Sequence, residues 1–584
     1  MSSKLINITA VFLLLFMVIM AITSMAQDSL TMDEVAHLPA GYSYLTQKDM
    51  RLNPEHPPLI KNLAALPLLF FKDEINFPSQ IQAWQEDVNG QWTFGYNFLY
   101  HSNNPVDKMT FWARIPMVLI LLVLGFYLFK WTKELFGEKA AFLSIFLFSF
   151  SPTFLAHSRL VTTDVGAAAG IFIATYYFIK ALKNPGQKNI ILSGVSFGIA
   201  QLCKFSVVLL IPFFFITAFF FWLMRLDKLK NVIKNIFLIM VIGFIIIWPL
   251  YQYHVWNYPS ERQYRDTEVY LKDYPVFIQK PVLWLTTVPV LRAYAQYITG
   301  VLMVLHRAAF GHTMYFMGEI SNLGWRNYFP IVYLIKEPLS LHILTLISLL
   351  ISTIYIAQSI KKPFWQETRV RLKTWIKEYF SQFAMLIFLV IYWASSLTSS
   401  LNLGVRHLLP VFPFVFLLVG GVISKFLKEP YLKLKVLILG FLMAFQASSV
   451  ISVYPHFLAY FNEIAGGPEN GYIFTVDSNL DWGQDLRRLT EWVNQNKIDR
   501  IYVDYFGGGD PRYYLKEKYS PWSGNKTEQE FPKENYLAVS ASPLQGGRGV
   551  AAPGFDQLTG YYNWLNKYQP VKRIGYSIFI YYID

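Results

Sequence analysis

Long apolar segments that alternate with short basic loops constrain this chain more than any other feature. A helix of about 20 apolar residues crosses the hydrocarbon core of a bilayer. Hydrophobic residues make up 54% of the 584 residues and charged residues only 15%, so most of the chain cannot be a soluble surface. We predict a polytopic α-helical membrane protein with about eleven transmembrane helices. The expected spans lie near residues 8–26, 112–130, 139–156, 163–181, 190–203, 205–224, 234–251, 338–358, 382–399, 408–424 and 434–453.

Lys and Arg gather in alternate loops, which predicts the orientation of the chain. These loops lie near residues 130–139, 180–188, 225–234, 361–377 and 425–435. Short cytoplasmic loops carry such an excess, so the formal net charge of +13 reflects topology, and no nucleic-acid partner is expected. We predict an integral protein of a bacterial plasma membrane with a cytoplasmic amino terminus. All the polar stretches considered below then lie on the extracytoplasmic side.

The amino-terminal apolar segment and the single cysteine bear on whether the chain is processed and on which disulfide or metal sites it can form. Residues 21–26 weakly resemble a signal-peptide cleavage site, but the run is long enough to span a bilayer, and we expect a retained helix. Cys203 is the only cysteine, so neither a disulfide framework nor a Cys-based zinc site is expected.

The pattern changes near residue 454 and predicts a second domain. Expected strands and helices alternate there, which is typical of a small α/β domain. The strands are expected at 472–476, 500–505, 535–540 and 577–581, and the helices at 481–494 and 561–567. We therefore expect a transmembrane domain over 1–453, with extracytoplasmic loops 27–111 and 252–335, and an extracytoplasmic α/β domain over 454–584.

Acidic and histidine residues follow the first apolar segment and begin a later one. Asp33, Glu34 and His37 form one group, Glu55 and His56 a second, and Asp164 stands alone. Ionisable groups held at a membrane indicate a functional site, here an acid/base centre. The alternatives are structural: Asp33 and Asp164 could cap helices, and Glu55 and His56 could begin one.

A metal site is a further hypothesis. His37, Glu55 and His56 offer nitrogen and oxygen ligands for a divalent ion. Their spacing matches no metal motif, and hydrogen-bonded structural histidines are the alternative. No other cofactor is expected.

Four motifs together resemble a known enzyme family. They are Asp33-Glu34, Glu55-His56-Pro57-Pro58-Leu59, Thr163-Asp164 and Gly404-Val405-Arg406-His407-Leu408-Leu409-Pro410. This arrangement is similar to the C-type (GT-C) polyprenyl-phosphate-sugar-dependent membrane glycosyltransferases, in the family 39-like group that contains protein O-mannosyltransferases and the aminoarabinose transferase of lipid A. Relatives that modify lipid A carry basic residues where this chain has Ala36 and His56, so the donor contacts are expected to differ.

The resemblance implies inverting transfer of a monosaccharide from a polyprenyl-phosphate donor to an extracytoplasmic hydroxyl on a protein, lipid or glycan. Asp33 is the expected base, with Glu34 and Asp164 beside it in the catalytic group. The departing phosphate needs cations and hydrogen-bond donors more than an acid. Those expected around it are Lys204, Arg406, His407, Arg159, Lys336, His56 and Lys61. Anchoring to lipid headgroups is the alternative for the lysines and arginines.

Two further stretches that could suggest binding sites have simpler structural explanations. Asp477, Asp481 and Asp485 suggest a metal or sugar site, but helix capping and ion pairs with Arg487 and Arg488 explain them more simply. Gly507-Gly508-Gly509 lacks the downstream signature of a phosphate loop, and we expect a flexible turn.

The aromatic-rich segment 251–333 is expected to form an interfacial belt and in part to cover the donor.

Two other functions are compatible with the same residues. A transporter or flippase of a lipid-linked substrate would line an alternating-access path with them. A cell-envelope assembly or binding factor would use the α/β domain to recruit partners.

The predicted topology has a direct test. A cytoplasm-only reporter fused after Asp584 should be inactive, and an export-dependent reporter at the same point should be active, because the α/β domain is expected outside. The opposite pair of results would overturn both the helix count and the location of the polar stretches.

Overall fold

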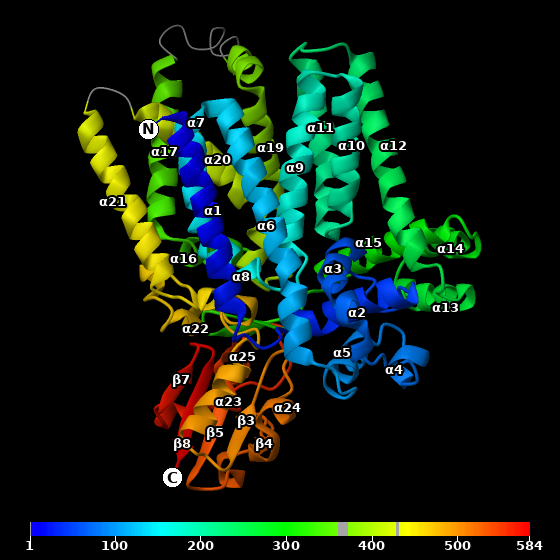
Figure 1. Ribbon diagram of the computed structural model, residues 1–584, viewed down its shortest axis with the longest axis vertical. Coiled ribbons are helices and arrows are strands. Elements are labelled where there is room, and N and C mark those ends of the chain that lie inside the picture. The colour runs from blue at the N-terminus through cyan, green and yellow to red at the C-terminus, as the bar shows by residue number, and fades with distance from the viewer. Residues whose placement is uncertain (1, 360–371, 428–430) are drawn as a thin grey trace.

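A bundle of apolar helices stands on a layer of short helices, and a small α/β domain lies beneath that layer (Figure 1). This computed structural model describes residues 2–359, 372–427 and 431–584. The bundle helices are α1 (Ser3–Met25), α6 (Val106–Phe136), α7 (Glu138–Ser149), α9 (Asp164–Lys183), α10 (Gln187–Gln201), α11 (Leu210–Leu223), α12 (Leu229–His254), α17 (Leu339–Ser359), α19 (Phe380–Thr398), α20 (Phe412–Phe426) and α21 (Leu432–Ile451).

Each expected span contains a helix of the bundle, although the span expected at 139–156 breaks after Ser149 and that at 408–424 becomes α-helical only from Phe412. The predicted fold class of a polytopic helical membrane protein with a carboxyl-terminal α/β domain is confirmed. In the described part of the chain, seven helices are long and apolar enough to cross a membrane, or eight if the bent pair Tyr328–Lys336 and Leu339–Tyr355 forms one span. The helices α7, α10 and α20 are shorter. The count of about eleven therefore stays a prediction.

The basic loops share one end of the bundle. The turns that join α6 to α7, α9 to α10 and α11 to α12 lie at the end away from the α/β domain (Figure 1). This arrangement agrees with the alternation from which the topology was predicted. The basic residues expected between 360 and 371, and Lys428, lie outside the described residues.

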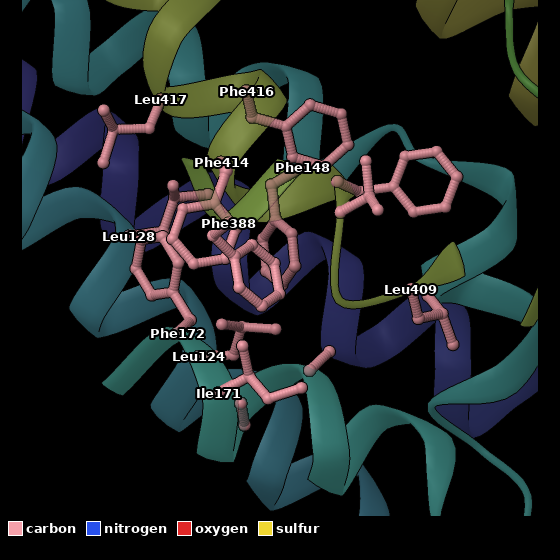
Figure 2. Packing of buried hydrophobic residues seen from close by; sticks show 14 of the residues in the cluster. Leu124, Leu128, Phe148, Ile171, Phe172, Phe388, Leu409, Phe414, Phe416 and Leu417 are labelled. Carbon is pink, nitrogen blue, oxygen red and sulfur yellow. The ribbon is translucent and has the colours of Figure 1, made fainter. Parts of the chain in front are cut away.

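The centre of the bundle is packed with aromatic and aliphatic side chains from α6, α7, α9, α19 and α20 (Figure 2). Phe414 lies 5.1 Å from Phe172 and 4.6 Å from Phe388 between ring centroids. Small residues allow α7 and α20 to approach closely, and Ser144 donates a hydrogen bond to the Phe416 carbonyl at 2.9 Å. The helices α7 and α20 contain only 12 and 15 residues, and short helical segments at 152–157 and 405–408 continue the chain from their ends.

Short elements fill the layer between the bundle and the α/β domain (Figure 1). The first group is α2 (Met32–Gln47), α3 (Pro58–Ala65), η1 (Leu66–Glu74), α4 (Gln82–Gln85), α5 (Gln91–Tyr100) and α8 (Pro152–His157). The second is α13 (Ser260–Leu271), α14 (Val276–Thr287), α15 (Arg292–Phe310), β1 (Met314–Phe316), β2 (Glu319–Ser321), α16 (Tyr328–Lys336) and η3 (Val405–Leu408).

The α/β domain contains a five-stranded sheet in the order β4-β3-β5-β8-β7. Its strands are β3 (Ile501–Asp504), β4 (Tyr519–Pro521), β5 (Asn535–Ser540), β7 (Lys572–Ile574) and β8 (Ile578–Ile583). β3 is parallel to β4 and β5, whereas β8 is antiparallel to β5 and β7. Its helices include α22 (Gly471–Phe474), α23 (Leu486–Gln495), α24 (Pro511–Leu515) and α25 (Ala541–Arg548), and β6 (Val550–Ala551) pairs with β2.

Several local predictions in this domain are corrected. The expected strand at 472–476 is a helical turn, α22, after which Thr475 makes a single bridge to Phe316. The helix expected from residue 481 begins only at Leu486, because Gly483 has a φ of +95° and closes against Gly507. Residues 563–567 form a 3-10 helix, η9, in place of the expected α-helix. The strands at 501–504, 535–540 and 578–583 were predicted correctly.

The glycine run at 507–509 is a docking surface and not merely a turn. The Gly508 N–H donates to the Leu30 carbonyl at 3.2 Å, and the Tyr96 and Tyr100 hydroxyls donate to the Gly507 and Gly508 carbonyls. A Cβ on Gly508 would lie 2.2 Å from the Thr31 carbonyl oxygen. The absence of side chains therefore lets the α/β domain press against the start of α2.

This contact predicts that Gly508→Ala destabilises the protein. The methyl group would push the α/β domain away from Thr31, and overpacking of this kind costs about 1–3 kcal/mol. Thermal unfolding in detergent should shift several degrees lower and proteolysis near residue 508 should increase. Gly186→Ala is the matched control because nothing lies within 4 Å of a Cβ at that position. Equal unfolding temperatures for both variants would show that this contact does not hold the domains together.

Candidate active site

A cavity of about 750 Å³ lies between the helical bundle and the α/β domain. Its lining combines residues of α2, the loop at 53–56, η2 (Phe205–Leu209) with the preceding Lys204, α15, η3 and the α/β domain. Among the predicted site residues, those that line it are Asp33, His37, Glu55, His56, Lys204, Arg406 and His407. Residues far apart in sequence thus meet at one place.

Asp33 and Arg406 form the central contact of the cavity. Arg406 Nη1 lies 2.6 Å from Asp33 Oδ2, and its guanidinium stacks on the Trp482 ring at 4.2 Å. The Asp33 side chain is 23% exposed, whereas that of Arg406 is 8% exposed. The carboxylate therefore faces the cavity while the arginine is held in its wall.

Asp164 lies behind this contact and joins it to Lys204. The Asp164 carboxylate accepts a hydrogen bond from Lys204 Nζ at 2.5 Å and lies 3.5 Å from Arg406 Nη1. Asp164 is buried and does not line the cavity. It is the first residue of α9, after the N-cap Thr163, and its contacts orient two cations whose side chains reach the cavity.

The local sequence explains why Asp33 and Glu34 have different surroundings. Glu34 Oε2 accepts hydrogen bonds from the Thr31 N–H at 2.8 Å and the Thr31 hydroxyl at 3.0 Å, which fixes the first turn of α2. Glu34 also pairs with Arg114 at 2.6 Å and accepts the Val161 N–H. It is fully buried outside the cavity, so this anchor presents its neighbour Asp33 to the cavity.

The charge of Asp33 is set by its neighbours. Burial alone would raise the pKa of the Asp33 carboxyl, but the Arg406 charge and His37 hold this pKa below its ordinary value. The carboxylate is therefore ionised at neutral pH and accepts hydrogen bonds. Burial lowers the pKa of His56 and of His407, so both imidazoles are neutral at that pH.

The predicted metal site is not formed. No group of three or more His, Cys, Asp or Glu side chains within residues 2–359, 372–427 and 431–584 is arranged to hold a metal ion. His37 donates from Nδ1 to the Val161 carbonyl at 2.9 Å and contacts the His56 ring edge-on. Glu55 accepts from Gln91 at 3.0 Å and lies 3.7 Å from Arg307. A hydrogen bond thus occupies His37, a hydrogen bond and an ion pair occupy Glu55, and His56 has a ring contact.

Three of the expected phosphate-binding cations lie outside the cavity lining. Arg159 pairs with Asp28, and Lys336 Nζ donates to the Leu458 and Asn479 carbonyls. Lys61 donates to the carbonyls of Asn53 and His56 at 2.8 Å. These contacts make Lys61 a support for the loop that carries Glu55 and His56.

The carboxylates of the 477–485 motif separate into different environments. Asp477 lines the cavity, and burial raises its pKa to about 6. Asp481 is fully buried, with Oδ2 accepting the Ser542 N–H at 2.7 Å, and burial raises its pKa to about 8. Asp485 pairs with Arg488 at 2.6 Å, as the structural interpretation of the sequence expected.

Sequence reasoning missed a second set of lining residues. They are Trp92, Arg307, His312, Trp482, Asp504, Tyr505, Phe506, Ser542 and Tyr561. Trp482 lies within the Asp477–Asp485 motif, and Tyr505 and Phe506 directly precede the glycine run. Those neighbouring motifs were the available signal, but no local pattern indicates that the α/β domain closes the cavity.

Comparisons with known proteins agree with the resemblance found in the sequence. Residues 106–253 match the family described as dolichyl-phosphate-mannose-protein mannosyltransferase. The matched segment contains one of the four motifs, Thr163-Asp164, and supports the resemblance to the GT-C glycosyltransferases that these motifs indicated. No curated protein matches the chain.

Three solved structures are similar to parts or all of the chain. ArnT from Cupriavidus metallidurans bound to undecaprenyl phosphate has 11% identity, 99% coverage of this chain, 98% of that chain and a TM-score of 0.44. The apo oligosaccharyltransferase of Archaeoglobus fulgidus has 13% identity, 91% and 69% coverage and a TM-score of 0.44. The Saccharomyces cerevisiae protein O-mannosyltransferase Pmt1-Pmt2 complex bound to the sugar donor has 17% identity, 44% and 34% coverage and a TM-score of 0.31.

The buried Asp481 carboxyl predicts a pH-dependent stability. Its folded-state pKa of about 8 exceeds its unfolded value, so the folded protein binds this proton more tightly, and the resulting stability is lost as the pH rises through 8. Asp481→Asn imitates the protonated form and should lose less stability than wild type between pH 6 and pH 9 in thermal unfolding. The exposed Asp499→Asn is the control. Parallel pH profiles for wild type and Asp481→Asn would contradict a protonated Asp481.

Proposed function

We propose that this protein is an inverting glycosyltransferase that moves a hexose or pentose from a polyprenyl-phosphate carrier to an acceptor hydroxyl. The observation that carries this proposal is that one cavity is lined by the ionised Asp33 carboxylate, by its partner Arg406 and by Lys204, which pairs with Asp164. The match of residues 106–253 to a family of lipid-phosphate-sugar-dependent transferases supports it.

The cations of the cavity suit a phosphate. Lys204 is held at 2.5 Å from Asp164 with its side chain 15% exposed, and Arg307 and the two neutral imidazoles of His56 and His407 line the same space. Arg406 Nε is buried without a hydrogen-bond partner among the described residues, so its donor capacity is not fully used. A phosphate that departs as an anion is stabilised by such donors without needing an acid.

A mostly apolar pocket of about 150 Å³ shares lining residues with the cavity and suits part of an isoprenoid chain. It is lined mainly by apolar side chains of α10, α11, α12 and α15, and it shares Val208 and Val301 with the cavity. A carrier lipid placed there would leave its chain among membrane helices while its phosphate reached Lys204. An apolar pocket beside a cationic cavity therefore supports a lipid-phosphate donor.

Asp33 is the proposed base. As the acceptor oxygen bonds to the sugar carbon C1, the bond from C1 to the phosphate oxygen breaks and the acceptor proton passes to Asp33. Attack on the face opposite the phosphate inverts the configuration at C1. We assign Asp164 and Glu34 as positioning residues, because each is buried outside the cavity and holds a group that lines it.

The orientation of the site is part of the proposal. The elements that line the cavity, among them α2, α15 and α16, lie at the end of the bundle opposite the α6–α7, α9–α10 and α11–α12 turns (Figure 1). A cytoplasmic location of these basic loops therefore places the chemistry and the α/β domain outside. The acceptor would then be an extracytoplasmic protein, lipid or glycan.

Replacement of the proposed base is the central test. Asp33→Asn keeps the shape of the side chain but cannot take the acceptor proton, so the transfer rate should fall by about 10²–10⁴. The measurement uses a polyprenyl-phosphate donor with a radiolabelled sugar, purified protein and host membranes as the acceptor mixture. Asp73→Asn, on the exposed end of η1, is the matched control and should be fully active.

A second variant separates chemistry from donor binding. Lys204→Ala should raise the KM for the donor by about ten- to a hundredfold, because a hydrogen bond to a charged group is worth roughly 1.5–3 kcal/mol. For the first variant, a transfer rate of Asp33→Asn within a few-fold of the wild-type rate would show that Asp33 is not the base. A wild-type protein that consumes no polyprenyl-phosphate sugar of any kind would refute the proposed function itself.

A further inference from the structure

The two walls of the cavity differ in charge. The part of the chain before residue 454 contributes Lys204, Arg307, Arg406 and several histidines. Among the described lining residues after residue 454 there is no Lys, Arg or His, and the polar groups there are carboxylates, hydroxyls and aromatic side chains. An anionic carrier phosphate fits the first wall, so a ligand of different chemistry belongs at the second.

We propose that this second wall is a carbohydrate-binding subsite, so that the acceptor is a glycan-bearing molecule. The subsite consists of Asp477, Asp504, Tyr505, Ser542 and Tyr561. The proposal rests on the proposed glycosyl transfer and specifies its acceptor. Carboxylates and hydroxyls accept hydrogen bonds from sugar hydroxyls, and aromatic rings pack against the apolar face of a sugar ring.

The aromatic and acidic groups are held rigidly, as recognition requires. The Tyr505 hydroxyl donates to the Gly483 carbonyl at 2.5 Å, and Asp504 Oδ2 accepts from the Tyr562 hydroxyl at 2.5 Å. The Tyr561 ring lies against Gly524 and Gly547, where a Cβ would come within 2.2 Å and 2.6 Å of it. Small side chains at these two positions therefore make a slot that fixes the ring.

Asp477 connects this wall to the proposed base. Its N–H donates to the Ser542 hydroxyl at 3.3 Å, and its charge, like that of Asp33, helps to raise the pKa of Arg406. Asp477 and Asp33 therefore both stabilise the charged form of the Arg406 guanidinium. Because Asp477 and Asp33 line the same cavity, a sugar bound at Asp477 would share that space with the proposed base.

Charge also restricts the kind of glycan. Asp477 and Asp504 disfavour an acceptor whose bound portion carries phosphate or carboxylate, because like charges repel in a partly dehydrated cavity. The subsite therefore selects a neutral or amino-bearing sugar.

The test measures saccharide binding without requiring the natural acceptor. Full-length protein in detergent is mixed with cellobiose, maltose and chitobiose, and binding is followed by saturation-transfer NMR. At least one disaccharide should bind to wild type, and Tyr561→Ala and Asp504→Asn should each weaken that binding about tenfold or more. Tyr561→Phe should retain it, because the ring face remains.

Controls separate a lost subsite from a lost fold. The exposed variants Asp499→Asn and Tyr513→Ala, outside the cavity, should bind like wild type. Wild-type protein that consumes donor but binds none of the disaccharides, or binds them equally in all variants, would overturn this subsite and leave the proposed function standing. Disaccharide binding that depends on Tyr561 in a protein that consumes no donor would refute glycosyl transfer while supporting the subsite.

Discussion

The ion pairs of Arg406 are the contacts on which the site depends. This one guanidinium touches Asp33 of α2, approaches Asp164 at the start of α9 and stacks on Trp482 of the carboxyl-terminal part of the chain. A buried charge is costly unless it is paired and hydrogen-bonded. Here the carboxylates of Asp33 and Asp164 together compensate the charge of Arg406. Loss of Arg406 would remove the cationic partner of Asp33 and leave Asp164 paired with Lys204 alone, so the three parts of the molecule that meet at the cavity are coupled through it.

A second buried network holds the α/β domain in the position that the cavity requires. Asp28 pairs with Arg159 and lies 2.8 Å from Arg488, which in turn pairs with Asp485. Backbone hydrogen bonds join Ser29 to Gln484 and Met32 to Trp482 in the same region. Arg159, which looked like a phosphate ligand in the sequence, therefore acts in docking. The backbone hydrogen bond between Met32 and Trp482 helps to dock the domain. Because Asp33 directly follows Met32, this bond also sets the distance between Asp33 and the Trp482 ring on which Arg406 stacks.

The sequence predicted the membrane part better than the site, for physical reasons. Apolar length is a local property, so the helical segments from 8–26 to 434–453 could be recognised one by one. Asp33, Lys204 and Arg406 were recognised because charged residues stand out beside apolar runs. Whether a charge faces a cavity or a buried partner depends on non-local contacts, which is why Lys61 and Lys336 could not be separated from Lys204.

The pair Asp33-Glu34 shows how neighbouring carboxylates acquire different tasks. Successive residues of a helix point about 100° apart, so one carboxylate turned toward Arg114 and Thr31 leaves the other turned toward the cavity. Glu34 is satisfied by four protein groups and has little capacity for a substrate, whereas Asp33 has one strong partner and an exposed edge. The buried anchor gives the exposed carboxylate a fixed direction. The proposed role of Asp33 therefore depends on Glu34, whose buried contacts fix the helical turn that directs Asp33 toward the cavity.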